Sequence, residues 1–256
     1  MTIGILKDVD AGVSIADSWP RGMGAGPEVI VAPPASLDDI GRRSSLIALA
    51  GPDHGLVEAV AALGLVAGPE AAVIATSPVV PLEVLRALAG AGPALFRAII
   101  PLGTEPGEGA VALAPEAGTP RETIERVKAA LAWIGVVEVV AEDALDAVAA
   151  LMLGGASLLA QALEGMEEGA VRDGLPRQTA RAFAHQTALA TALLLRGHSG
   201  SPADLKDQVA SPGGTTIAAL ASLEDAGVRG ACIRAVQRTA VEVRRRRNAV
   251  LSSVIE

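Results

Sequence analysis

The sequence is poor in cysteine and in aromatic residues, and each shortage excludes a class of protein. Its 256 residues include one Cys, two Phe, two Trp and no Tyr. The single thiol, Cys232, excludes a disulfide scaffold and a cysteine-based zinc site. Few aromatic rings are available for stacking on nucleic-acid bases. We therefore expect no metal site, and we expect the protein to work in a reducing compartment, the cytoplasm.

Positive charge is also in short supply. The formal net charge is −8, so the chain has no general attraction for nucleic-acid backbones or anionic membranes. The first residues, MTIGILKDVDAG, lack the basic and apolar regions of a signal peptide. Apolar runs are broken by charge or Gly within about 15 residues, short of the ~20 that span a bilayer. These features predict neither a nucleic-acid partner nor a membrane partner.

Aliphatic residues are abundant, and in the first part of the chain they form short runs that alternate with helical segments. This alternation predicts an α/β domain with a parallel sheet, in which ligands bind at the carboxyl ends of the strands. We expect strands at 2–6, 28–32, 45–50, 71–75, 95–100, 109–113 and 136–140, and helices at 55–64, 82–90 and 119–133.

The pattern changes to nearly continuous helix near residue 141. We therefore divide the chain into an α/β domain, residues 1–141, and an all-helical domain, residues 142–256. The stretch 145–163 contains few polar residues, which indicates a helix buried on all sides or sandwiched in a dimer. The expected helices of this domain are 143–170, 176–196, 202–209, 215–226 and 228–250.

The most informative motif runs from Leu205 to Glu224, LKDQVASPGGTTIAALASLE. Its composition predicts a helix, a tight turn and a second helix, with Gly213 and Gly214 supplying conformational freedom in the turn. The start of the second helix offers unpaired backbone N–H groups and the positive end of a helix dipole. Such a cradle suits a carboxylate, although a plain cap by Ser or Thr is the simpler explanation of the same residues.

The run from Leu205 to Ile217 resembles the signature L-[KR]-[DEQ]-x-V-x-S-P-G-G-[TA]-T-I of pyrroline-5-carboxylate reductases. The segment DGLPRQTARAFAHQT also resembles that family. The resemblance implies a Rossmann-like domain followed by a helical dimerisation domain, and NAD(P)H-dependent reduction of a cyclic imino acid. It implies that the substrate is held by six residues, with Thr216 also close to the imine nitrogen: Lys206, Ser211, Gly213, Gly214, Thr215 and Thr216.

The chain departs from the family where the cofactor should bind. The family has a glycine fingerprint, G-x-G-x-[ML]-[GA], after the first strand. The equivalent residues here are Lys7, Asp8, Val9, Asp10, Ala11 and Gly12. A branched side chain at Val9 and the carboxylates of Asp8 and Asp10 oppose a pyrophosphate. The segment before SLIALA is also too short for the family's additional helix and strand, which predicts a truncated, degenerate Rossmann-like domain.

Other family motifs are altered as well. The lysine of V-K-P is replaced in Ala50-Gly51-Pro52, and the asparagine of M-P-N-T-P becomes Pro101. The motif S-G-S-G-P-A becomes the run from Met152 to Ser157, in which Gly155 alone is retained. The carboxylate loop is therefore intact beside an altered cofactor site, and we expect no cofactor.

Three functions follow from this contrast. The first is a dimeric enzyme, a homodimer or a higher multiple of dimers, that binds a small amino or imino acid. It would perform non-redox cyclisation, isomerisation or imine chemistry in specialised metabolism. The second is an NADP- or NAD-dependent imine reductase with an unorthodox cofactor site, and the third is a non-catalytic regulatory protein. The candidate catalytic residues are Thr216, His198 and His54. The two histidines are candidates because a side chain with a pKa near 6.5 suits proton transfer.

Overall fold

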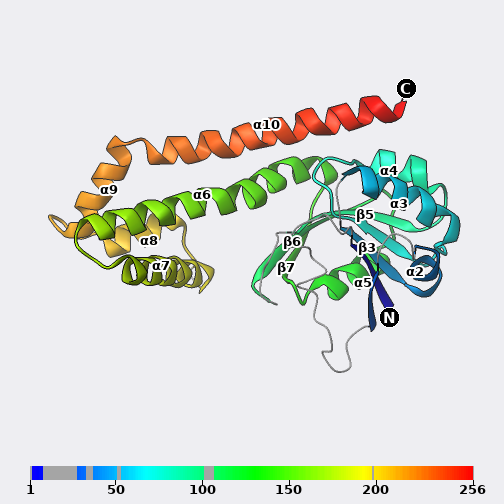
Figure 1. The fold of residues 1–256 in the computed structure, drawn as a ribbon, viewed down its shortest axis with the longest axis horizontal. Coiled ribbons are helices and arrows are strands. Elements are labelled where there is room, and N and C mark those ends of the chain that lie inside the picture. The colour runs from blue at the N-terminus through cyan, green and yellow to red at the C-terminus, as the bar shows by residue number, and fades with distance from the viewer. Residues whose placement is uncertain are drawn as a thin grey trace. The chain divides into compact units, whose positions relative to one another are not determined.

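The N-terminal part of the chain is built around one twisted sheet (Figure 1). The computed structural model describes residues 2–7, 28–32, 37–50, 53–100, 107–197 and 199–255. Within these ranges the sheet has seven strands in the order β2-β1-β3-β4-β5-β6-β7. Their bounds are β1 (Thr2–Lys7), β2 (Glu28–Ala32), β3 (Leu46–Ala50), β4 (Ala72–Ala75), β5 (Ala94–Ile99), β6 (Gly109–Pro115) and β7 (Gly135–Val139).

Strands β1 to β5 are parallel, and the chain reverses its direction of winding at β1. Strand β1 pairs with β2 on one side and β3 on the other, and β4 and β5 continue outward from β3. The carboxyl ends are level with one another, because Lys7 pairs with Ala50 and Leu49 pairs with Ala75. This is the topology in which a crevice for a ligand forms at the carboxyl edge, next to the strand where the winding reverses.

Helices cover both faces of this sheet. On one face lie α2 (Leu37–Arg43), α3 (Asp53–Val66) and α4 (Leu82–Ala89), and on the other lies α5 (Arg121–Leu131) (Figure 1). The buried residues are almost all aliphatic, as the composition predicts, with Phe96 the one fully buried aromatic side chain among the described residues. The predicted fold class, a Rossmann-like domain followed by a helical one, is confirmed.

Two expectations about the sheet need correction. Strand β6 runs antiparallel to β5, with Ile99 opposite Ala112, so the sheet is mixed and not wholly parallel. Helix α2 was not expected, because its sequence LDDIGRR buries one apolar side chain, Ile40, and has no apolar repeat. The expectation that the segment between β2 and β3 is too short for a helix is therefore wrong, while among the described residues it contains no strand and β2 is the edge strand of the sheet.

The rest of the chain is helical. It comprises the 3₁₀ turn η2 (Glu142–Ala144) and helices α6 (Leu145–Arg172), α7 (Arg177–Gly197), α8 (Pro202–Val209), α9 (Thr215–Asp225) and α10 (Val228–Ile255). By compactness the chain divides into one unit of Met1–Met152 with Thr239–Glu256 and a second unit of Leu153–Arg238. Our division at residue 141 stays a prediction.

Helix α6 is apolar and largely exposed in the single chain. Leu159 is 66% exposed, and on α7 Phe183 is 64% exposed. A helix buried on all sides is therefore excluded within this chain. By length and composition alone, the segment Glu142–Arg172 could also cross a membrane, contrary to our estimate from the apolar runs. The runs look short because Gly and single charges interrupt them, although they lie on one continuous helix.

Candidate functional site

The strongest candidate site is the turn between α8 and α9, where the sequence predicts a carboxylate cradle. Helix α8 ends at Val209, and α9 begins at Thr215, as predicted. Gly213 has a φ of 69°, which favours glycine, and the N–H of Gly214 donates to the carbonyl oxygen of Ser211 at 3.0 Å. The predicted turn between two helices is confirmed.

The N-terminus of α9 has no side-chain cap. Its N-cap residue is Gly214, which has no side chain, and no side-chain hydrogen bond reaches the cap. The simpler explanation of the motif, a cap by Ser or Thr, is therefore wrong. The first N–H groups of the helix remain without intrahelical partners, at the positive end of its dipole.

Helix α8 provides the contrast within the same unit. Its N-cap, Ser201, forms a capping box with Asp204, in which each side chain accepts from the other residue's backbone N–H. A carboxylate of the chain itself thus occupies the positive end of α8. At α9 the corresponding position is open, which is what binding of an external carboxylate requires.

Gly214 also keeps the cradle narrow. A Cβ built at this position would lie 2.3 Å from Ser211 Oγ and 3.2 Å from the Ser211 carbonyl oxygen. The missing side chain is what allows the Ser211 hydroxyl to stand directly beside the start of α9. Thr215 is exposed and Thr216 half-buried in the single chain, and Lys206 is half-buried on α8.

The remaining predicted site residues are not brought to this turn by any described contact. His198 lies outside the described residues, as do Asp8, Val9, Asp10, Ala11 and Gly12. Lys7 is the last residue of β1, at the carboxyl edge of the sheet. His54 is the second residue of α3, which follows β3 at the same edge, and its side chain lies outside the described part of the structure.

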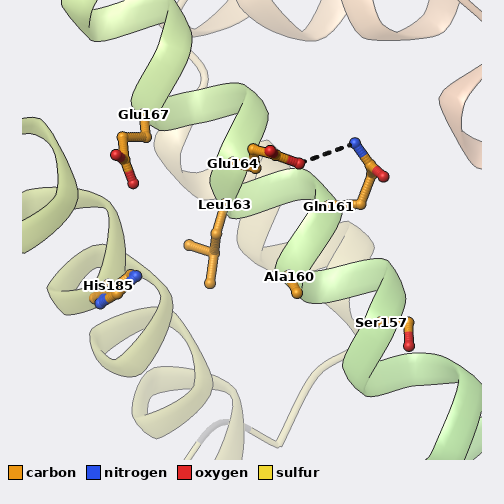
Figure 2. Close-up of a pocket in the computed structure, with 7 residues that line it drawn as sticks. All are labelled: Ser157, Ala160, Gln161, Leu163, Glu164, Glu167 and His185. Carbon is orange, nitrogen blue, oxygen red and sulfur yellow. Dashed lines mark hydrogen bonds between the residues drawn. The ribbon is translucent and has the colours of Figure 1, made fainter. Parts of the chain in front are cut away.

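A groove between α6 and α7 was not expected from the sequence. It encloses about 530 Å³ and is lined by Ser157, Ala160, Gln161, Leu163, Glu164, Glu167 and His185 (Figure 2). His185 on α7 lies across from Leu163 and Glu167 on α6. The helix position of His185 among Ala residues and Phe183 favours a core or an interface histidine. It is exposed in the single chain, which excludes the core of this chain, and an interface position stays a prediction. Among the described residues, no group of three or more His, Cys, Asp or Glu could hold a metal ion.

Glu167 joins the two helices that form this groove. Its carboxylate accepts from Arg181 at 3.1 and 3.2 Å and from Arg177 at 3.2 Å, and Arg177 also bonds Glu168 at 2.7 Å. The hydrogen bonds from Arg181 and Arg177 hold the pKa of Glu167 below its ordinary value. The spacing of Glu164, Glu167 and Glu168 predicts a solvated helix face, but Glu167 is buried. Sequence spacing does not reveal the arginines on the next helix that pair with it.

At the carboxyl edge of the sheet, two neighbouring strands end in small residues, Ala50 on β3 and Ala75 on β4. The loop after β4 begins with Thr76, whose hydroxyl donates to the Leu49 carbonyl oxygen at 2.8 Å. Small residues at these strand ends are compatible with a dinucleotide, a group that the structure does not contain.

Comparison with known proteins identifies the helical part of the chain. Residues 142–246 match the family model described as pyrroline-5-carboxylate reductase dimerisation. The pyrroline-5-carboxylate reductase of Synechocystis is 41% identical over 116 residues, 45% of this chain and 43% of that protein. Pyrroline-5-carboxylate reductase 3 of Danio rerio is 40% identical over 121 residues, 47% of this chain and 41% of that protein. The match spans less than half the length of these curated relatives.

Solved structures share the fold of almost the whole chain. The 1-pyrroline-5-carboxylate reductase of Streptococcus pyogenes superposes with a TM-score of 0.79 at 22% identity, covering 95% of this chain and 98% of that one. The pyrroline carboxylate reductase of Plasmodium falciparum, solved with NADP bound, gives a TM-score of 0.76 at 16% identity, covering 96% and 98%.

These findings overturn our expectation that no cofactor is used. The curated relatives are named reductases, and a structure of the same fold contains NADP. The missing glycines after β1 do not by themselves exclude a dinucleotide. Phosphates are bound by backbone N–H groups and helix N-termini, which other side chains do not abolish. The turn from Ser211 to Thr216 falls inside residues 142–246, the part of the chain that is similar to the dimerisation domain of pyrroline-5-carboxylate reductases.

Proposed function

We propose that this protein is an NAD(P)H-dependent imine reductase of the pyrroline-5-carboxylate type, which converts a cyclic imino acid to the corresponding amino acid. The observation that carries the proposal is the uncapped N-terminus of α9 behind the glycine turn. Non-redox chemistry is not needed to explain this site, since a reductase substrate carries the same carboxylate.

The substrate carboxylate would bind at the start of α9. The N–H groups of the first turn and the Ser211 hydroxyl offer hydrogen bonds to its oxygens, and the helix dipole favours its charge. Thr216, the second residue of α9, would hydrogen-bond near the imine nitrogen and so orient the ring. These residues position the substrate, and Thr216 fixes the orientation of the C=N bond.

The dinucleotide would lie across the carboxyl ends of β1, β3 and β4, of which β3 and β4 end in alanine. When bound, its nicotinamide supplies the hydride for the imine carbon. At this edge the chain would bind the dinucleotide through the backbone that follows each strand and through the loop from Thr76 to Pro81.

The exposed apolar surface of the helical unit would be buried in a homodimer. The matched family model is a dimerisation domain, and it covers α6 to α9 and much of α10. Exposed apolar residues on these helices include Leu151, Leu159, Met166, Phe183, Leu189, Leu193, Leu194, Ile233 and Val241. An apolar surface of this extent is typical of a protein–protein interface. The cytoplasmic location stays a prediction.

The test combines cofactor binding with turnover. Purified protein is titrated with NADPH and with NADH by nucleotide fluorescence, and oxidation of the nucleotide is followed after pyrroline-5-carboxylate is added. We expect saturable binding of one nucleotide and substrate-dependent oxidation, from a protein that light scattering finds as a dimer.

A matched pair of variants on α9 locates the site. Thr216→Ala should lower kcat/KM for the imino acid by about tenfold or more, since one hydrogen bond to a charged group contributes roughly 1.5–3 kcal/mol. Ser222→Ala, on an exposed position of the same helix, should leave it unchanged. Absence of binding by both nucleotides, together with no turnover, would refute the proposal.

A further inference from the structure

Strand β5 carries a fully buried cation. Arg97 is 0% exposed and lies opposite Ala75, the last residue of β4. It shares a face of the sheet with apolar residues that pack against α3 and α4. Burial of a guanidinium is costly unless it is paired and hydrogen-bonded, so its partners show what this residue holds in place.

The partners of Arg97 belong to the loop after β4 and to the turn after β7. Its Nη2 donates to the carbonyl oxygens of Ser77 at 3.3 Å and Pro78 at 3.0 Å. Its Nη1 donates to Glu142 Oε1 at 2.8 Å. The Ser77 hydroxyl in turn accepts from the N–H groups of Val79 and Val80, both at 3.0 Å. The loop is thus fixed both by Arg97 and from within.

Glu142 fixes the other end of the same loop. Its Oε1 also accepts from the N–H of Leu82 at 2.7 Å, at the start of α4. The N-cap of α4 is Pro81, which contributes no side-chain hydrogen bond. A carboxylate 60 residues further along the chain therefore does the work of the missing cap, and it occupies the positive end of α4.

The Arg97–Glu142 pair holds this loop at the carboxyl edge of the sheet, one strand away from β3. An ion pair in such a position contributes little net stability compared with apolar side chains of the same size. Its distinguishing property is directional: Arg97 and Glu142 together satisfy two carbonyl acceptors and one N–H donor along one loop, and Ser77 satisfies two further N–H donors. Glu142 remains 33% exposed, so the pair is not sealed in the core.

We propose that Arg97 and Glu142 are positioning residues for the dinucleotide, which they serve by fixing the loop from Thr76 to Leu82 that borders its site. The inference rests on the proposed reductase function. It assigns to Glu142, in the turn between β7 and α6, a role in cofactor affinity that does not extend to the carboxylate cradle on α9.

The test compares Glu142→Ala and Glu142→Gln with Glu138→Gln, which changes an exposed carboxylate on β7. We expect Glu142→Ala to weaken NADPH binding at least tenfold, and Glu142→Gln, which keeps one acceptor oxygen, to weaken it less. The KM for the imino acid at saturating NADPH should stay within twofold of the parent. Glu138→Gln should match the parent in both measurements.

Hydrogen exchange supplies a readout that does not depend on catalysis. In Glu142→Ala the amide of Leu82 loses its acceptor, so exchange in a peptide spanning Val79 to Leu82 should accelerate at least tenfold, while peptides from α9 should not change. The double variant Arg97→Met/Glu142→Met removes both charges and protects against simple misfolding. It should remain folded, with a Tm several degrees below the parent because α4 loses its cap, and bind NADPH at least tenfold more weakly.

The outcomes separate the inference from the function on which it rests. If the parent binds neither nucleotide, the proposed function fails. If the parent binds NADPH and both Glu142→Ala and the double variant bind it equally well, the positioning role is overturned. Unchanged exchange from Val79 to Leu82 in a folded Glu142→Ala protein would overturn it as well.

Discussion

Replacement of Gly214 by Ala tests the carboxylate cradle through a single methyl group. The backbone of Gly214 has a φ of −80° and a ψ of 175°, an extended conformation that any residue adopts. Alanine therefore introduces no backbone strain. Its Cβ would nevertheless lie 2.3 Å from Ser211 Oγ, far inside ordinary contact. The hydroxyl of Ser211 must move for the variant to fold.

The size of the effect follows from that distance. Ordinary contact begins at 3.4 Å, so Oγ must withdraw by roughly 1 Å, which is enough to break a hydrogen bond made at normal length. A hydrogen bond to a carboxylate contributes roughly 1.5–3 kcal/mol. Since about 1.4 kcal/mol corresponds to a factor of ten, we expect Gly214→Ala to raise the KM for the imino acid roughly ten- to a hundredfold.

A double-mutant cycle with Ser211→Ala decides whether this reasoning is correct. Removal of Oγ leaves a Cβ at 214 with its nearest neighbours at 3.2 and 3.6 Å, so the methyl group then fits with little movement. Gly214→Ala should therefore have a large effect on KM in the parent and a small one in the Ser211→Ala background. Equal effects in both backgrounds, or an unchanged KM in a folded Gly214→Ala dimer, would refute the role of the Ser211 hydroxyl.

Three further substitutions test the fold. Gly64→Ala would place a Cβ 2.5–2.7 Å from the Ala89 backbone on α4, so it should cost roughly 1–3 kcal/mol and lower the Tm by several degrees in calorimetry. Glu167→Gln should be less stable than the parent at pH 7. The difference between the parent and Glu167→Gln in the free energy of unfolding, measured with urea, should shrink as the pH falls below about 4.5. The pKa of Glu167 is lowered in the fold, so its contribution to stability is lost as that carboxylate protonates. Ser201→Ala should lower the free energy of unfolding by about 1 kcal/mol and accelerate amide exchange in the first turn of α8. Amide exchange in the rest of α8 should be unchanged.

The sequence predicts most helices and strands to within two or three residues because their boundaries carry local signals. Gly90 ends α4 with a φ of 61°, as a C-cap glycine does, and Pro202 begins α8 directly after its Ser201 cap. Helix α2 lacks such a signal. Its glycine, Gly41, is there for tertiary packing, since a Cβ would lie 2.5 Å from Val66 Cγ2 on α3.

Strand direction cannot be predicted from the same local signals. The run GAVALAP of β6 is buried along most of its length, and such a run suits a parallel or an antiparallel strand equally. The direction is fixed by tertiary pairing, in which Phe96 to Ile99 meet Pro115 to Ala112 in reverse order. Our expectation of a wholly parallel sheet failed because it extended the direction of the first five strands to the sixth.

Ion pairs between distant segments account for what the sequence missed around the sites. The run Arg244 to Arg247 suggests a solvated basic tail, yet Arg247 bonds the buried Asp146 at 2.7 Å, and Glu242 accepts from Arg245 and Arg246. The two hydrogen bonds from these arginines lower the pKa of Glu242 to about 2. Arg97 and Glu142 are likewise 45 residues apart. Only the three-dimensional fold brings such partners together.

The starts of α8 and α9 show what local sequence reveals and what it leaves open. Ser201 and Asp204 meet the rule for a capped helix, whereas the residues around Gly214 allow a cap by Ser or Thr, and only the structure shows that the start of α9 has no side-chain cap. A helix with an open positive end forgoes about 1 kcal/mol of capping unless an external anion completes it. A dinucleotide site has no such single requirement. It is assembled from the ends of several strands and their backbone, and its loss cannot be inferred from two glycines.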